Sequence, residues 1–105
     1  MFFKKKYDGI IEAVRYNPDG LLVQARVYER IGSTFTDRLL LSRQELVERI
    51  KSGKRFMIGQ RKPFLAGSFE TGAEVRLNSK AGKLWLSTSI DSTEERDMLQ
   101  GAPLF

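Results

Sequence analysis

The sequence contains neither cysteine nor histidine. Without cysteine the chain can form no disulfide, no thiolate nucleophile and no cysteine-ligated metal centre. Without histidine it lacks the usual general base at neutral pH and a common ligand of zinc and haem. These two absences exclude catalytic triads, zinc fingers and most redox sites. We therefore predict a non-enzymatic protein, and we expect no catalytic residue, no metal and no cofactor.

Long apolar runs are also missing. No window approaches the ~18–20 apolar residues that cross a bilayer. The chain begins with Met1-Phe2-Phe3 ahead of Lys4, Lys5 and Lys6, whereas a secretory signal peptide places its basic residues before an apolar stretch. The sequence therefore predicts a cytoplasmic protein. Attachment to an anionic membrane through residues 1–6 is the weakest of the partner hypotheses, and we do not expect it.

Short alternating segments separated by turn residues dominate the 105 residues, a length typical of one domain. The turn Asn17-Pro18-Asp19-Gly20 combines a proline, which presets φ, with a glycine that accepts positive φ. It predicts a hairpin between its flanking segments, and in the second of these Leu21, Val23, Ala25 and Val27 alternate with other residues. The predicted strands are 5–16, 21–28, 34–41, 55–58, 67–77 and 84–90.

The strongest local signal is a helix over residues 43–51. Ser42 and Glu45 have the S-x-x-E spacing of a capping box, in which each side chain accepts a hydrogen bond from an unpaired backbone N–H. Leu46 and Ile50 lie four residues apart, which gives the helix one apolar face. Gly53 follows where a left-handed cap is favoured.

Six strands and one short helix after the third strand predict a mainly β fold. We expect a small, strongly bent antiparallel barrel of the OB-like or SH3-like kind, with an open α+β sheet as the alternative. Residues 1–90 would form this single domain. Residues 91–105 would form an acidic C-terminal tail, partly helical or flexible, or else docked on the barrel through its apolar residues.

Charge is unevenly distributed along the chain, which carries 18 Lys and Arg against 13 Asp and Glu. Residues 1–90 hold 17 of the basic and nine of the acidic residues, whereas residues 91–105 hold one basic and four acidic residues. The densest basic segment, residues 49–62, contains six basic residues and no acidic one. Such a segment favours an anionic partner. It is also typical of a solvated helix end beside a charged edge strand.

The first functional hypothesis is a nucleic-acid-binding barrel, for DNA or RNA, that binds single strands or tolerates any sequence. Basic side chains would contact phosphates and exposed rings would stack bases. The predicted phosphate contacts are Lys54, Arg55, Arg61 and Lys62, assisted by Lys4, Lys5 and Lys6. The predicted stacking rings are Trp85 and Tyr28.

The second hypothesis is a protein-interaction module or homodimer that uses a sheet edge or the C-terminal end. The acidic segment ending in Pro103-Leu104-Phe105 resembles the tails of single-stranded-DNA-binding proteins, which finish in a Pro-Phe pair and dock onto repair and replication proteins. Here Arg96 interrupts the acids and Leu104 separates the proline from the phenylalanine. The resemblance implies a protein partner that contacts Leu104 and Phe105.

Overall fold

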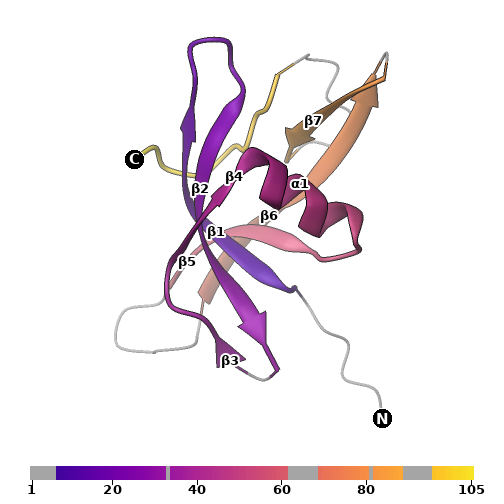
Figure 1. Ribbon diagram of the computed structural model, residues 1–105. Helices are drawn as coiled ribbons and strands as arrows, with labels where there is room; N and C mark the ends of the chain where they lie inside the picture. The colour runs from indigo at the N-terminus through magenta and orange to yellow at the C-terminus, as the bar shows by residue number, and fades with distance from the viewer. Residues whose placement is uncertain (1–6, 33, 62–68, 81, 89–95) are drawn as a thin grey trace.

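The computed structural model describes residues 7–32, 34–61, 69–80, 82–88 and 96–105 (Figure 1). It contains seven strands and one helix, which alternate with short connections. They are β1 (Gly9–Tyr16), β2 (Leu22–Ile31), β3 (Thr34–Phe35), β4 (Leu39–Ser42), α1 (Arg43–Lys51), β5 (Phe56–Arg61), β6 (Phe69–Lys80) and β7 (Lys83–Ser87). The prediction of a mainly β chain with one helix is confirmed.

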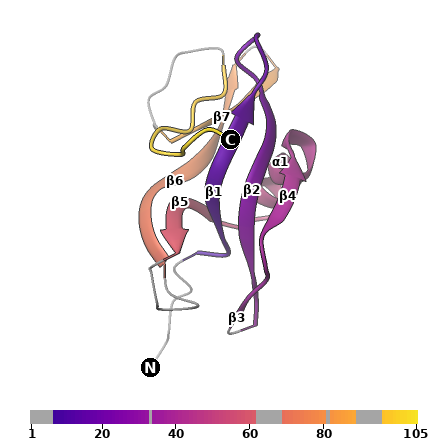
Figure 2. The same ribbon diagram turned by 90° about the vertical axis from the view of Figure 1, so that its left-hand side faces the viewer.

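The strands form one sheet in the order β3-β2-β1-β5-β6-β7, and β4 also pairs with β2. The sheet curls into a half-barrel, which Figure 2 shows from the side. An antiparallel barrel was expected, but β1 and β5 pair in parallel. The reason is the long connection between them, because the chain crosses over through α1 and returns beside β1 in the same direction.

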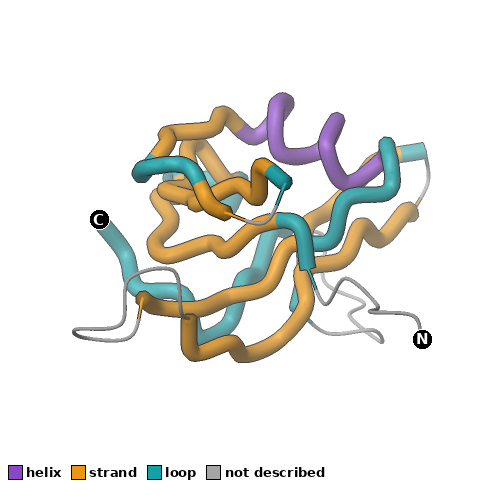
Figure 3. The backbone as a smooth tube through the Cα atoms, turned by 90° about the horizontal axis from the view of Figure 1, so that it is seen from below, coloured by secondary structure: helices purple, strands orange, loops and turns teal. Residues whose placement is uncertain are grey.

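The predicted third strand, 34–41, is divided into β3 and β4, and α1 therefore follows β4. The helix spans the predicted residues, and both bonds of its capping box are present. The Glu45 N–H donates to Ser42 Oγ at 3.2 Å, and the Ser42 N–H donates to Glu45 Oε1 at 3.0 Å. The bond from the Ser42 backbone lowers the pKa of the Glu45 carboxyl. Figure 3 shows α1 on one side of the curled sheet.

Two β-bulges interrupt the β1–β2 hairpin. Ile11 pairs with Val27 while Ala13 pairs with Arg26, so Glu12 has no residue opposite it. On the other strand, Val23 is the extra residue between the partners of Arg15 and Tyr16. The alternation predicted for residues 21–28 is therefore wrong at its start, where Val23 is exposed. A bulge shifts which side chains face the core by one position.

Apolar side chains pack on both faces of the sheet. Ile11 and Val27 belong to the main core, which also holds Leu46 of α1. Their neighbours Ile10 and Tyr28 belong to a second, smaller cluster. Since successive side chains of a strand point to opposite faces, the smaller cluster lies on the outer face of the half-barrel.

Residues 96–105, here called the C-terminal strap, connect β7 at one end of the sheet with β1 in its middle. Met98 forms a parallel bridge with Ser87 of β7, and Leu104 forms one with Val14 of β1. The Val14 N–H donates to the Pro103 carbonyl at 2.9 Å. The strap is therefore docked on the half-barrel, as one of the alternatives for the tail supposed. Residues 91–95 and the expected domain boundary at residue 90 lie outside the described residues.

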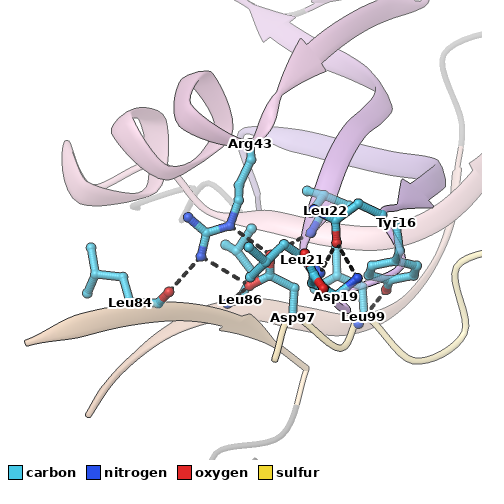
Figure 4. A network of polar contacts seen from close by, with 10 residues as sticks. Tyr16, Asp19, Leu21, Leu22, Arg43, Leu84, Leu86, Asp97 and Leu99 are labelled. Carbon is cyan, nitrogen blue, oxygen red and sulfur yellow. Dashed lines mark hydrogen bonds and ion pairs between the residues drawn. The ribbon is translucent and has the colours of Figure 1, made fainter. Parts of the chain in front are cut away.

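Asp97 fixes the strap in place (Figure 4). Its residue is 3% exposed, and its carboxylate accepts hydrogen bonds from the N–H groups of Leu22 at 2.7 Å and Leu86 at 2.8 Å. Arg43 donates to the same carboxylate through Nε at 2.7 Å and a terminal nitrogen at 3.2 Å. One buried side chain therefore joins β2, β7 and α1 to the strap.

We expect Asp97→Asn to lower the free energy of unfolding by about 3 kcal/mol, because it removes the buried charge that pairs with Arg43 and places an amide NH2 donor against the N–H donors that both carboxylate oxygens now accept. Urea denaturation monitored by circular dichroism measures the change. Asp37→Asn, at an exposed residue, is the matched control and should change stability by less than about 0.5 kcal/mol. Equal effects of the two substitutions would contradict the role given to Asp97.

Candidate nucleic-acid interface

The basic segment 49–62 is partly neutralised by acidic side chains from other elements. Arg49 forms an ion pair with Glu29 of β2. Arg55 donates to Glu74 of β6 at 2.9 Å. Lys54 is exposed and has no acidic partner among the described residues. Of the predicted phosphate contacts in this segment, Lys54 is therefore open to solvent, whereas Arg55 already has a carboxylate.

The structure does not gather the predicted phosphate contacts at one point. Lys54 and Arg55 precede β5, and Arg61 is its last residue. At ~3.3 Å per residue, Arg55 and Arg61 lie about 20 Å apart along the strand. Lys62 and residues 4–6 fall outside the described residues, so their part in the prediction stays a prediction.

The prediction that Tyr28 stacks on a base is wrong. Tyr28 is 2% exposed, and its ring packs against Phe69 at a centroid distance of 5.1 Å. Its hydroxyl donates to Glu12 Oε2 at 3.0 Å and accepts from Arg38 Nε at 2.8 Å. Both faces of strand β2 are covered here, because the outer face carries its own apolar cluster.

Trp85 lies on β7, opposite Asn78 of β6, and is half-buried. Its indole nitrogen is buried and has no hydrogen-bond partner among the described residues. The ring lines a shallow pocket together with Arg43 and Lys83. A stacking role for Trp85 stays a prediction, and this pocket is where it would act.

Four arginines that stand singly in the sequence lie along the outer face of β1 and β2, where Arg15 and Arg30 are about 20 Å apart at ~3.3 Å per residue. We call this surface the arginine face; its members are Arg15, Arg26, Arg30 and Arg38. Arg26 and Arg38 lie on either side of the Glu12 carboxylate, at 3.2 and 3.1 Å from Oε1. The β1 bulge at Glu12 therefore places one buried acid between two cations.

Aromatic rings continue the arginine face in both directions. The guanidinium carbons of Arg15 and Arg26 lie 4.7 and 4.9 Å from the centroid of the Phe105 ring. Arg30 lies 4.7 Å from the ring centroid of Phe35 and 5.3 Å from that of Tyr7. Guanidinium groups and rings thus alternate over the surface, an arrangement favourable to cation–π attraction.

Three of the four guanidiniums donate a hydrogen bond through Nε, whereas Arg26 Nε is buried without a hydrogen-bond partner among the described residues. Arg15 Nε donates to the main-chain oxygen of Phe105 at 3.1 Å, Arg30 Nε to that of Tyr7 at 2.9 Å, and Arg38 Nε to Tyr28. Arg26 Nε lies at ion-pair distance from Glu12. The terminal nitrogens of these four arginines donate no hydrogen bond to the part of the chain that the structure describes.

The arginine face as a whole could not be predicted from the sequence, because its members are spread over residues 15–38. Among the described residues, Glu12 is the one carboxylate that forms an ion pair with any member of the arginine face, and its partners are Arg26 and Arg38. Part of the arginine face could have been predicted from β2 alone. Side chains two residues apart on a strand point to the same face, so Arg26, Tyr28 and Arg30 share one.

Other kinds of site find less support. In the described ranges, no cluster of acidic side chains is suited to hold a metal ion. No helix within these ranges is long and apolar enough to cross a membrane. Comparisons with protein-family models, curated proteins and solved structures found no match. A function is therefore inferred from the geometry of this chain alone.

The Arg55–Glu74 pair predicts a change of stability with pH. The hydrogen bond from Arg55 lowers the pKa of the Glu74 carboxyl below its ordinary 4.5. The pair's stabilisation is therefore complete above pH 4.5 and is lost as the pH falls through the lowered pKa. We expect the free energy of unfolding of Glu74→Gln to fall less steeply than that of the unmodified protein as the pH is lowered from 4.5. Urea midpoints measured at a series of pH values below 4.5 test this.

Glu70 provides the control for that titration. It is exposed on the same strand and has no ion-pair partner among the residues described. Glu70→Gln should leave the acid dependence of the urea midpoint like that of the unmodified protein. An acid dependence unaffected by Glu74→Gln would contradict the assignment.

Proposed function

We propose that this protein is a non-enzymatic nucleic-acid-binding barrel whose binding surface is the arginine face. The observation that carries the proposal is that three of the guanidiniums are held by an Nε hydrogen bond and the fourth by an ion pair, with their terminal nitrogens left without a hydrogen bond in the described residues. An arginine presents planar N–H donors that match the oxygens of a phosphate. Anchored side chains also lose less conformational entropy when they bind.

The rings on this surface favour single-stranded or sequence-tolerant binding. Tyr7 and Phe35 are half-buried beside Arg30, so each keeps some ring surface in contact with solvent. Unpaired bases stack on such rings irrespective of their sequence. The predicted contacts Lys4–Lys6 directly precede Tyr7, and Arg61 pairs with Phe69 of the outer cluster. On this proposal either DNA or RNA would be bound.

The fold is compatible with this use. We infer that the half-barrel acts in the manner of an OB-like or SH3-like barrel, in which strand faces bind the ligand. The sheet curls around the main core on its inner side, and the arginine face lies on the opposite, convex side of β1 and β2. The protein would then need no cofactor, since contacts to phosphates and bases supply the affinity.

We expect the double variant Arg15→Gln/Arg38→Gln to bind a fluorescein-labelled single-stranded 12-mer about tenfold or more weakly at low salt. The slope of log affinity against log salt should fall by about 1.4, since two phosphate contacts are lost. Fluorescence anisotropy across a salt series measures both quantities.

The control is Lys51→Gln/Lys54→Gln, which removes the same charge from two exposed residues at the end of α1 and in the connection to β5. If the arginine face is the interface, this control should lose much less affinity than Arg15→Gln/Arg38→Gln. A larger loss in this control would move the interface to the basic segment 49–62. No binding by the unmodified protein at low salt would refute nucleic-acid binding altogether.

A protein-interaction module is the second candidate, favoured by apolar exposure at a sheet edge. β4 pairs with β2 and with no other strand of the described chain. Leu40 in β4 is 56% exposed, and Ile31 at the end of β2 is also exposed. An exposed edge of this kind can add a strand from a second chain.

This candidate predicts a dimer that Leu40→Glu converts to a monomer, because a charge on the edge opposes pairing. Size-exclusion chromatography with light scattering measures the mass of both proteins. A monomeric mass for the unmodified protein over the whole accessible concentration range would rule out self-association through this edge.

A further inference from the structure

The last residue of the strap lies within the arginine face. The Phe105 ring has the guanidinium of Arg15 at 4.7 Å and that of Arg26 at 4.9 Å from its centroid. Its main-chain N–H donates to the Val14 carbonyl at 3.1 Å. Its main-chain oxygen accepts from Arg15 Nε at 3.1 Å. The residue therefore brings a flat ring and an oxygen acceptor to the same two arginines.

A nucleotide offers the same two chemical groups. Its base is a flat ring that stacks on guanidinium planes, and its phosphate supplies oxygen acceptors. The base also carries polar edge groups, which a phenyl ring lacks, and the phosphate is charged. A nucleotide can therefore satisfy the terminal nitrogens of Arg15 and Arg26, which Phe105 leaves without hydrogen bonds to described residues.

We infer that Phe105 occupies a base-binding slot between Arg15 and Arg26 and is displaced when a single-stranded nucleic acid binds. This inference rests on the proposed function, and it makes the Phe105 ring a competitor of the nucleic acid for the arginine face. The affinity of the unmodified protein for nucleic acid is then lowered by the free energy needed to remove the ring. A ligand that lacks bases would gain less from the slot than one that carries them.

The ring can leave without the strap. The main-chain bonds of Val14 to Pro103 and Phe105 hold the strap end, and Asp97 holds its beginning. None of these bonds involves the Phe105 side chain. Rotation of that side chain, or its truncation to alanine, thus opens the slot while the barrel stays closed.

Phe105→Ala tests the inference, with Leu104→Ala as the control. The Leu104 residue is 72% exposed and neighbours Phe105 on the same strap, so its truncation leaves the slot filled. We expect Phe105→Ala to bind the labelled single-stranded 12-mer about 5- to 30-fold more tightly, the gain from two cation–π contacts no longer lost on binding. Leu104→Ala should bind like the unmodified protein.

The outcomes separate this inference from the proposed function. Unchanged or weaker binding by Phe105→Ala, with normal binding by the unmodified protein, overturns the competitor role and leaves nucleic-acid binding in place. Absence of binding by both proteins overturns both ideas. A gain shared equally by Leu104→Ala would assign the effect to the strap as a whole and would also overturn the competitor role.

A measurement on the unmodified protein avoids any effect of the substitution on folding. The ring protons of Phe105 can be followed by NMR during titration with a single-stranded 12-mer and with an abasic oligomer of equal length. We expect the base-bearing oligomer to move these resonances toward those of a solvent-exposed phenylalanine and the abasic oligomer to move them much less. Resonances that stay in place with the base-bearing oligomer bound would show that the ring is not displaced.

Discussion

The buried carboxylate of Asp97 joins parts of the chain that are 11 to 75 residues apart in sequence. It lies in the strap and accepts hydrogen bonds from the first residue of β2, from β7 and from the first residue of α1 (Figure 4). A buried carboxylate is unfavourable unless donors surround it, so its position requires all three partners at once. Asp97 thereby holds the beginning of the strap, and the main-chain bonds of Val14 to Pro103 and Phe105 hold its end.

The position of the strap in turn determines which side chains lie on the outer face of the sheet. The strap fixed by Asp97 continues to Leu104, which pairs with β1 beyond the end of its contact with β5. Phe105 is thereby brought between two arginines on the convex side of the sheet. The stability of the half-barrel and the composition of the candidate interface thus share a single structural element, the strap.

Glu12 has a comparable role within the arginine face. Its bulge position directs a carboxylate to Arg26, Arg38 and Tyr28, and this contact spaces the guanidiniums without neutralising the whole surface. The segment 49–62 shows the opposite case. There, Glu29 and Glu74 approach Arg49 and Arg55 from strands β2 and β6, so a dense basic sequence becomes a less charged surface.

The sequence alone determined the local features: the helix with its Ser42–Glu45 cap, the hairpin turn, the approximate position of most strands, and the chemistry excluded by the lack of cysteine and histidine. Each of these depends on residues within a few positions of one another. The tertiary structure decided the burial of Tyr28, the pairing of Arg55 with Glu74, and the placement of Arg15, Arg26, Arg30 and Arg38 on one face of the sheet. These depend on strand register and crossover, where a shift of one residue moves a side chain to the other face.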